Sequence, residues 1–249
     1  MINEFKPLER FSDRVENYIK YRPAYPKEVI NFLKNNIALN SEHIIADIGS
    51  GTGISSINFL ENKNKVIGIE PNDNMRSASE KLLMVYPNFT AVKASAENTT
   101  LPDKSIDIIL AGQAFHWFDV ENAKKEFKRI LKDDGCVVLI WNEKDFSKEL
   151  MAEYEHILLK YGTDYAEVKH NNIDTHILKS FFDKGYHETD FNNEQIFDFA
   201  GLKGRLLSSS YIPVDNSQMI DDLKVLFDKF QLEQNVKFEY KTKVYFGQL

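Results

Sequence analysis

Two acidic residues and three glycines mark a stretch of the chain with the chemistry to hold a polar ligand. Asp47 precedes glycines at alternate positions, Gly49, Gly51 and Gly53, and Glu70 follows the last of them by 17 residues. Glycines let the backbone turn tightly and approach a ligand without intervening side chains. An acid at the end of the following strand can accept hydrogen bonds from both hydroxyls of a ribose. The pattern predicts a site for a nucleotide-like cofactor at the start of a helix.

The spacing of the glycines departs from the dinucleotide-binding fingerprint. In that fingerprint the third glycine would fall at Ile54, and an apolar residue is usual where Asp47 stands. An acid beside the loop suits a cationic or amino-bearing ligand better than a pyrophosphate. Residues 95–97, Ser-Ala-Glu, follow the third expected strand, where an adenine ring would lie. Together these features make the site more specific than the glycines alone.

These residues require a sheet whose strand ends meet at one edge. Apolar strands and amphipathic helices alternate through the first part of the chain, with Asp119 as the N-cap of a helix that carries Phe127 and Ile130 on one stripe. Such alternation predicts an α/β fold with a doubly wound, mostly parallel sheet. Asp134 and Gly135 mark the turn into a fifth strand. We expect strands over residues 43–48, 65–70, 89–92, 106–110 and 136–141, and helices over 54–60 and 74–86.

The pattern changes after Trp141. Residues 146–185 look mostly helical, and the alternating tail at 236–246 predicts a strand with one covered face that closes an antiparallel pair. Between them we expect a strand over 188–195, helices over 197–207 and 219–230, and a loop over 208–213. We expect a single domain over residues 1–249, made of an N-terminal arm or lid at 1–40, a cofactor-binding core at 41–145, a substrate-side cap insertion at 146–235 and a closing strand at 236–249.

Composition and charge are those of an ordinary globular protein, and we expect it in the cytoplasm. The net charge of −7 argues against a broad nucleic-acid surface. No apolar run approaches the roughly 20 residues of a membrane-spanning helix, and the start of the chain has no signal-peptide core. Cys136 is the single cysteine and lies in an expected strand, so we interpret it as a buried core residue. The histidines show no metal-ligand spacing, and we expect no metal.

Aromatic residues and an arginine precede the first expected strand. Phe11, Tyr18 and Tyr21 lead into Arg22, and two nearby prolines break any helix there. The second of them, Pro26, suits the first turn of the next helix. Two interpretations stand side by side. The aromatic residues pack an N-terminal arm, or they close over the ligand with Arg22 as a lid.

Several stretches together resemble one known family. They are residues 47–53, 69–72 with Met75, 95–97 with Leu101 and Pro102, 105–109, and the run Gln-Ala-Phe-His-Trp-Phe at 113–118. Over about residues 11–141 the chain resembles the class I S-adenosylmethionine-dependent methyltransferases. Residues 21–26, 115–118 and, less specifically, 204–211 are similar to the small-molecule branch that includes trans-aconitate methyltransferase-like proteins. The resemblance implies a Rossmann-like seven-stranded sheet with an antiparallel C-terminal strand, S-adenosylmethionine as cofactor and S-adenosylhomocysteine as product.

The resemblance also implies a role for each matching residue. Asp47 would face the amino group of the cofactor, directly or through water, and Glu70 would hold the ribose hydroxyls. Ser95 stands where the family often has an aspartate that contacts the adenine amino group, so the backbone of Ala96 or the side chain of Glu97 is an alternative contact. The implied cofactor contacts are Tyr21, Arg22, Asp47, Gly49, Ser50, Gly51, Gly53, Glu70, Pro71, Asn72, Met75, Ser95, Ala96, Glu97, Gln113 and Ala114.

Methyl transfer from a sulfonium needs no protein nucleophile. Alignment of the acceptor with the methyl group can supply about 7–11 kcal/mol, and an aromatic face can stabilise the sulfonium by about 0.5–2 kcal/mol. For a hydroxyl or amine acceptor His116 is the candidate base, whereas a carboxylate acceptor needs none and His116 is then a structural residue near the strand end. Arg205 either contacts the acceptor or pairs with a surface acid. The substrate-side candidates are Phe11, Tyr18, Phe115, His116, Trp117, Arg205 and Tyr211.

We therefore expect a methyltransferase that acts on a small molecule, without nucleic-acid or membrane partners. A nicotinamide-dependent oxidoreductase is an alternative, against which Asp47 and the lack of a glycine at position 54 count. A non-catalytic module that senses the cofactor is another. No Asn-Pro-Pro-Tyr-like tetrapeptide follows the fourth expected strand, which disfavours methylation of a flipped base. Oxygen, nitrogen and carbon acceptors all fit this pattern.

Overall fold

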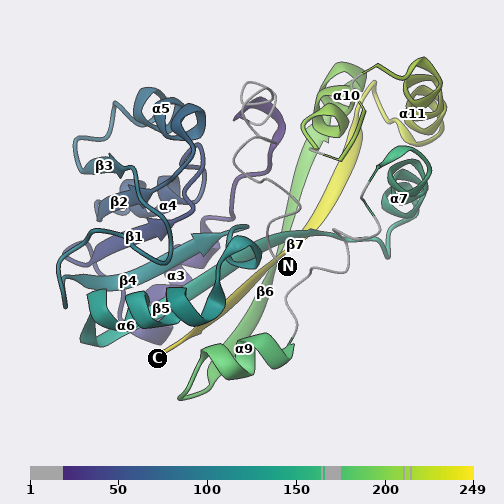
Figure 1. Ribbon diagram of the computed structural model, residues 1–249. Coiled ribbons are helices and arrows are strands. Elements are labelled where there is room, and N and C mark those ends of the chain that lie inside the picture. The colour runs from purple at the N-terminus through teal and green to yellow at the C-terminus, as the bar shows by residue number, and fades with distance from the viewer. Residues whose placement is uncertain (1–18, 164, 166–174, 210, 214) are drawn as a thin grey trace.

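A computed structural model describes residues 19–163, 165, 175–209, 211–213 and 215–249 (Figure 1). Within these residues strands and helices alternate as predicted up to β5. The elements in chain order are α3 (Glu28–Ile37), β1 (Ile44–Ile48), α4 (Ser56–Glu61), β2 (Lys65–Ile69), α5 (Asp73–Leu82), β3 (Phe89–Val92), β4 (Ile106–Gly112), the 3₁₀ turn η2 (Phe115–Trp117), α6 (Val120–Ile130), β5 (Leu131–Lys144), α7 (Glu149–Tyr161), α9 (Thr175–Phe181), β6 (Tyr186–Phe197), α10 (Phe199–Leu207), α11 (Ser217–Phe230) and β7 (Val236–Gly247).

The seven strands form one sheet in the order β3-β2-β1-β4-β5-β7-β6. The pairs among β1 to β5 are parallel, and β7 lies antiparallel between β5 and β6. This confirms the predicted mostly parallel sheet with an antiparallel C-terminal strand. The strand order reverses between β1 and β4, so the carboxyl ends of these two strands border a crevice. In open sheets of this kind ligands bind at that crevice.

Strand β1 is buried on both faces of the sheet. Ala46 and Ile48 join a hydrophobic core with α6 and α9, and Ile45 joins a second core with α3 and α4 on the other face. Because helices cover both faces, the residues of the strand are apolar except for Asp47, which lies next to the glycine loop. Helix α6 begins where predicted, since the side chain of Asp119 accepts a hydrogen bond from the backbone N–H of Asn122 at 3.2 Å. The strand that precedes the glycine loop is thereby fixed from both sides.

A third hydrophobic core lies beside the far halves of β6 and β7. There α7, α10 and α11 pack together, away from the parallel strands (Figure 1), and contribute Tyr154, Leu202 and Leu223 respectively. The long strand β7 takes part in all three cores. Phe238 belongs to the third core, and Phe246 belongs to the core that holds Ile45. Tyr245, on the opposite face, belongs to the core that holds Ala46.

The region predicted as a cap insertion divides between two cores. Helices α7, α10 and α11 form the separate unit just described, but Leu178 and Phe181 of α9 pack into the core beneath α6. An ion pair between Lys124 on α6 and Asp183 ties the segment after α9 to the same face. The helix α9 is therefore part of the sheet's own covering layer. No helix among the described residues is both long and apolar enough to cross a bilayer.

Some predicted boundaries are wrong, and β5 differs most. It begins at Leu131, which pairs with Ile106, so Asp134 and Gly135 lie inside the strand and a register shift before Ile108 accommodates them. The strand also continues beyond Trp141 to Lys144, because β7 pairs with it there. Elsewhere α5 ends at Leu82, α10 starts at Phe199, and α3 starts at Glu28 with Lys27 as its N-cap, which leaves Pro26 before the helix.

Candidate functional site

The loop after β1 has the geometry that its glycines predict. Gly49, Gly51 and Gly53 all have positive φ, at 67°, 56° and 86°. A Cβ at Gly49 would lie 2.6 Å from the Cβ of Ala114, so only glycine lets the loop approach the end of β4 this closely. A Cβ at Gly51 would meet nothing within 4 Å, and here the left-handed backbone itself requires glycine. The loop therefore packs against β4 at one glycine and opens at the next.

Glu70 joins this loop to the end of β2. Its Oε2 accepts a hydrogen bond from the backbone N–H of Gly51 at 2.8 Å, and its Oε1 accepts one from Asn72 at 2.8 Å. Burial raises the pKa of Glu70, although these two bonds and the charge of Arg76 oppose the shift. Each carboxylate oxygen can accept more than one hydrogen bond. The same carboxylate can thus shape the loop and bind a ligand hydroxyl.

Asp47 is completely buried below the loop. Its Oδ2 accepts hydrogen bonds from the hydroxyls of Ser55 and Ser56, both at 2.7 Å, at the start of α4. Its Oδ1 is buried and has no hydrogen-bond partner within the described part of the chain. Burial raises the pKa of Asp47 to about 6, against the two serine bonds and with a further contribution from the charge of Glu70. A buried carboxylate oxygen without a partner fits a water or an ammonium group brought by a ligand.

One cavity combines the glycine loop with the ends of β4 and β5 and with the segment before α3. Tyr25 reaches this cavity from that segment, and its hydroxyl would lie 2.9 Å from a Cβ at Gly112. Glycine at the end of β4 therefore gives the tyrosine its place. The residues around the cavity are Arg22, Pro23, Tyr25, Gly49, Ser50, Gly51, Thr52, Ile54, Ser55, Gly112, Gln113 and Asn142.

Gln113 has a strained backbone at the carboxyl end of β4. Its φ is 57°, a left-handed conformation that costs free energy in a residue with a side chain. Its backbone N–H donates to the carbonyl of Ile140 at 2.9 Å, and its Nε2 donates to the carbonyl of Asn142 at 3.3 Å. These bonds to β5 hold the strained residue beside the cavity, just past the fourth strand.

Asn142 lines the cavity but was not predicted. Its Nδ2 donates to the carbonyls of Pro23 and Ala24, and its Oδ1 accepts from Asn193 on β6 and from Thr242 on β7. It thus binds the segment before α3 to three strands. One signal in the sequence was available, since a polar residue directly follows the apolar run 136–141, as Gln113 follows the apolar part of β4.

The residues predicted around the adenine have structural partners of their own. The Oδ1 of Asn72 caps α5 by accepting from the backbone N–H of Met75 at 3.0 Å, and Met75 itself is buried. Oε1 of Glu97 accepts from the backbone N–H of Asp119 at 2.9 Å and so ties its loop to the start of α6. These residues, with half-buried Pro71 and Ser95 and buried Ala96, follow the carboxyl ends of β2 and β3. Their adenine role stays a prediction.

The aromatic turn after β4 divides between core and surface. Phe115 is 1% exposed and its ring centroid lies 4.7 Å from that of Phe181, so it belongs to the core beneath α6 and does not line the cavity. His116 is exposed, and its ring tilts against Trp117 at 4.7 Å. The atoms crowded around the imidazole lower the pKa of His116 to about 4, even though the residue as a whole is exposed. It is therefore neutral at pH 7, and within the described residues it makes no hydrogen bond.

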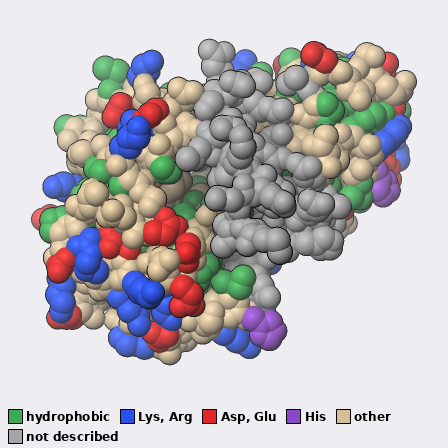
Figure 2. Space-filling model, viewed as in Figure 1, with side chains coloured by type: hydrophobic (Ala, Val, Ile, Leu, Met, Phe, Trp, Pro, Cys, Tyr) green, Lys and Arg blue, Asp and Glu red, His purple; other side chains and the backbone are tan. Residues whose placement is uncertain are grey.

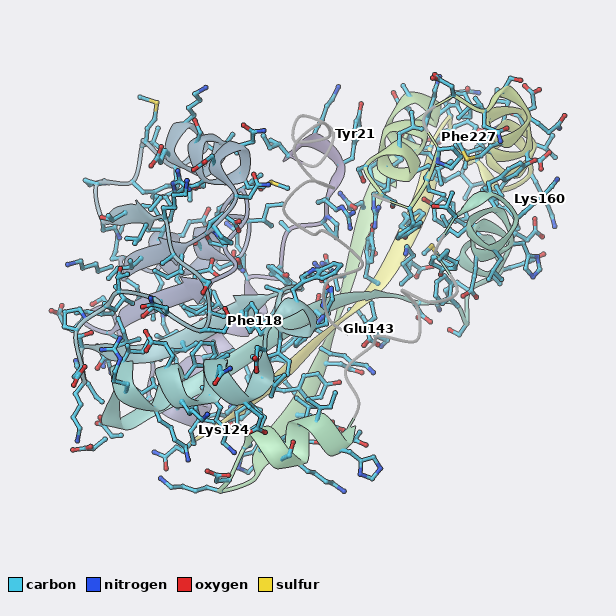
Figure 3. The ribbon with its side chains drawn as sticks, viewed as in Figure 1. Tyr21, Phe118, Lys124, Glu143, Lys160 and Phe227 are labelled. Carbon is cyan, nitrogen blue, oxygen red and sulfur yellow. The ribbon has the colours of Figure 1, made fainter. Side chains whose placement is uncertain are left out.

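Three further candidates lie toward the helical unit formed by α7, α10 and α11. Tyr21 packs directly on α10, since a Cβ at Gly204 would lie 2.0 Å from its ring, and Figure 3 labels it beside that helix. Arg205 is buried and donates to Tyr240 at 3.0 Å, so the predicted alternative of a surface ion pair is wrong. Tyr211 accepts a hydrogen bond from Lys144 at 3.4 Å. Phe11 and Tyr18 lie outside the described residues.

Within the described ranges no group of His, Cys, Asp or Glu is arranged to hold an ion. Cys136 is buried in β5 as predicted, and burial raises the pKa of its thiol to about 12. A thiol with such a pKa is a poor nucleophile at neutral pH.

Comparisons with known proteins agree with this geometry. Residues 46–139 match a family model described as a methyltransferase domain. An uncharacterized methyltransferase of Schizosaccharomyces pombe is 30% identical over 247 residues, which cover 94% of this chain and 95% of that protein. A second protein of the same yeast, an uncharacterized methyltransferase-like protein, is 30% identical over 158 residues, 63% of this chain and 60% of its own length. The solved structure of the YcgJ protein of Bacillus subtilis has the same fold, with a TM-score of 0.56 and 19% identity over 90% of this chain and 100% of that one.

Proposed function

Because this chain belongs to the class I S-adenosylmethionine-dependent methyltransferases, we propose that it transfers a methyl group from S-adenosylmethionine to a small-molecule acceptor by in-line displacement. The observation that carries the proposal is the presence of two buried acids on either side of the glycine loop, at the point where Gly51 leaves open space. Glu70 accepts a hydrogen bond from the backbone N–H of Gly51, and Asp47 lies below the same loop with an Oδ1 that no described residue contacts by a hydrogen bond. A ligand with an amino group at one end and a ribose diol at the other matches these two acceptors.

The chain's residues divide the work around the cofactor. Asp47 would hold its amino group, Glu70 its ribose hydroxyls, and Gly49 and Gly51 would leave the backbone accessible beside it. The bound cofactor supplies an electrophilic methyl group on a cationic sulfonium. Gln113, fixed by its bonds to β5, and Asn142, fixed by four hydrogen bonds, would form a rigid wall that orients the acceptor. Positioning of this kind is the main source of rate in such a displacement.

A small molecule is the acceptor class that the surface favours. On the face that Figure 2 shows, Lys and Arg side chains alternate with Asp and Glu over α6 and its neighbours. Several form ion pairs, including Lys128 with Asp183 and Arg129 with Glu126. A nucleic-acid-binding surface would instead carry a cluster of Lys and Arg side chains without interspersed acids. For a hydroxyl or amine acceptor, neutral His116 is the proposed base.

Calorimetric titration tests the cofactor assignment. We expect S-adenosylmethionine and S-adenosylhomocysteine to bind, and reduced nicotinamide nucleotides not to bind, because Asp47 and Ile54 disfavour a pyrophosphate. Binding of the nicotinamide nucleotide alone would refute the proposal and favour an oxidoreductase. Methyl transfer from labelled S-adenosylmethionine to a panel of small acceptors tests catalysis. Tight cofactor binding without transfer to any acceptor would favour the non-catalytic module.

A further inference from the structure

A cationic cluster of buried Arg205 and half-buried Lys144 lies between the sheet and the helical unit formed by α7, α10 and α11. Arg205, on α10, is 3% exposed, and its Nε donates to the hydroxyl of Tyr240 on β7 at 3.0 Å. Lys144, at the end of β5, donates to the hydroxyl of Tyr211 at 3.4 Å. Lys144 and Tyr240 occupy paired positions on β5 and β7. Two cationic side chains thus converge on one patch of the sheet face.

The cluster has no acidic partner among the described residues. Arg205 also donates through Nη1 to the hydroxyls of Ser208 and Ser209, both at 3.4 Å, and its guanidinium lies 5.7 Å from the ring centroid of Phe238. Each of these partners is neutral. In the part of the chain that the structure describes, Nη2 of Arg205 has no hydrogen-bond acceptor. A buried cation without a counterion is costly unless an anion joins it in the working state.

A buried hydroxyl without a partner lies in the same cluster. Tyr154, on α7, is 0% exposed, and its hydroxyl has no hydrogen-bond partner among the residues that the structure describes. Its ring centroid lies 4.8 Å from that of Phe238, the ring on which the guanidinium of Arg205 also packs at 5.7 Å, so Tyr154 and Arg205 share a neighbour. Buried polar groups are nearly always hydrogen-bonded. The hydroxyl of Tyr154 therefore offers an unused donor near Arg205.

The cluster lies next to two residues that line the cofactor cavity. Asn142 lines that cavity, and Lys144 follows it by two residues on the same face of β5, about 7 Å farther along the strand. Arg22 also lines the cavity, and its Nη2 donates to the carbonyl of Ser208, next to the end of α10, at 3.1 Å. A molecule that enters beside Asn142 would extend toward Arg205. The atom that receives the methyl group would lie at the Asn142 end.

We propose that Arg205, Lys144 and Tyr154 bind a carboxylate of the methyl acceptor, as an anchor remote from the atom that is methylated. The inference rests on the proposed function, because it assigns a substrate class to that site. A planar guanidinium and a carboxylate match in geometry, and Lys144 and Tyr154 supply additional donors. The anchored carboxylate neutralises the cluster and is not the nucleophile. A second polar group on the same molecule attacks the methyl carbon as the carbon–sulfur bond breaks.

Anion binding is tested with the full chain saturated with S-adenosylhomocysteine. Acetate, succinate and benzoate present a carboxylate on bodies of different size, and each is compared with its neutral amide at constant ionic strength, by thermal unfolding and nuclear magnetic resonance titration. We expect at least one acid to bind more tightly than its amide. Tyr154→Phe should weaken that binding about tenfold without lowering stability, because the deleted hydroxyl bonds to no described residue. Arg205→Met should abolish it.

Tyr186→Phe, on β6 and away from the cluster, is the matched control and should bind the acid as the wild type does. The inference is overturned if acids and amides act alike, or if Tyr154→Phe and Arg205→Met both bind as the wild type does. Inorganic phosphate is an additional arm, and a preference for it over every acid would also overturn the carboxylate assignment. Failure of S-adenosylhomocysteine to bind would instead refute the proposed function. Cofactor binding without discrimination of the acids would refute this inference alone.

Discussion

The backbone N–H of Gly51 donates to Oε2 of Glu70 at 2.8 Å, and this bond joins the loop after β1 to the end of β2. Oε1 of the same carboxylate accepts from Asn72, so one side chain holds two loops at the carboxyl edge of the sheet. The acid that we propose for the ribose hydroxyls is therefore also a structural clamp. Substitution can separate the two roles, because one affects unfolding and the other affects ligand affinity.

The first prediction concerns Glu70→Gln. The amide keeps the shape but turns one acceptor oxygen into a donor that faces a backbone N–H. We expect the free energy of unfolding to fall by about 1–3 kcal/mol and the affinity for S-adenosylhomocysteine to fall about tenfold or more. Urea unfolding and calorimetry measure the two effects. Glu80→Gln, on the exposed face of α5, is the control and should change neither. Unchanged affinity in Glu70→Gln would exclude Glu70 from the ribose contacts.

The second prediction concerns the pH dependence that Asp47 imposes. Burial raises its pKa in the folded state to about 6, above the ordinary value of 3.8. An acid whose pKa is raised by folding binds its proton more tightly in the folded state than in the unfolded state. Its contribution to stability is therefore fully present below about pH 4 and is lost as the pH rises through 6. Asp47→Asn carries no charge at any pH. We expect it to gain about 3 kcal/mol of unfolding free energy relative to the wild type between pH 4 and pH 7.

Urea unfolding of both proteins across this range measures the effect of Asp47. If the unfolding free energies of the wild type and Asp47→Asn change with pH in the same way, Asp47 keeps an ordinary pKa in the folded protein. Ligand affinity gives a second reading, because an ammonium group near Oδ1 favours the carboxylate form. S-adenosylhomocysteine should therefore bind the wild type more tightly as the pH rises from 5 to 7. In Asp47→Asn this dependence should be absent.

The third prediction is an early ionisation of Tyr211. Burial opposes ionisation, but the charge of Lys144, a hydrogen bond with Ser209 and the charges of Arg205 and Arg22 outweigh it and lower the pKa of Tyr211 to about 8. We expect the ultraviolet absorbance of tyrosinate to rise in a separate step near pH 8. Tyr211→Phe should remove the step, and Lys144→Met should move it to higher pH. If all tyrosines instead titrate in a single step near the ordinary pKa of about 10, the positive charges do not lower the pKa of Tyr211.

The fourth prediction tests the contact between α10 and Tyr21. A Cβ at Gly204 would lie 2.0 Å from Cε2 of Tyr21, so Gly204→Ala must displace the ring or the helix. We expect a loss of about 1–3 kcal/mol of unfolding free energy. In the double variant Gly204→Ala with Tyr21→Ala most of the added cost should disappear, because the two side chains no longer overlap. Lys203→Ala, exposed on the same helix, is the control. Additive effects of the two substitutions would show that the contact is absent.

Local patterns in the sequence predicted the parallel half of the fold well. The run from β1 through the glycine loop to α4 depends on contacts close in sequence, as does the Asp119 cap of α6, and both were located correctly. Glu70 was found because the end of β2 must lie beside the end of β1 in a doubly wound sheet. The local pattern also predicted a turn at Asp134 and Gly135. This prediction is wrong, because pairing with β4 keeps these residues in a strand.

The residues that sequence analysis missed depend on contacts between distant segments. Asn142 holds the site together through hydrogen bonds to Pro23, Asn193 and Thr242. These three partners come from distant parts of the chain, so no local pattern marks Asn142. Arg205 was recognised as a candidate, but its partner Tyr240 lies in an alternating strand that gives no sign of a buried hydroxyl. Phe115 was expected near the acceptor because its neighbours match a motif. Packing against Phe181, which comes from a much later helix, places it in the core.

The position of β7 between β5 and β6 sets an order for assembly of the protein. β6 precedes β7 along the chain, yet every strand pairing of β6 in the described sheet is with β7. β6 therefore stays an unpaired segment until β7 has been synthesised, and it joins the sheet only through β7. Folding steps that depend on such long-range pairing are slow and leave strand edges exposed. The parallel half, with its glycine loop, can form first, and the site for the acceptor is then the last part of the molecule to mature.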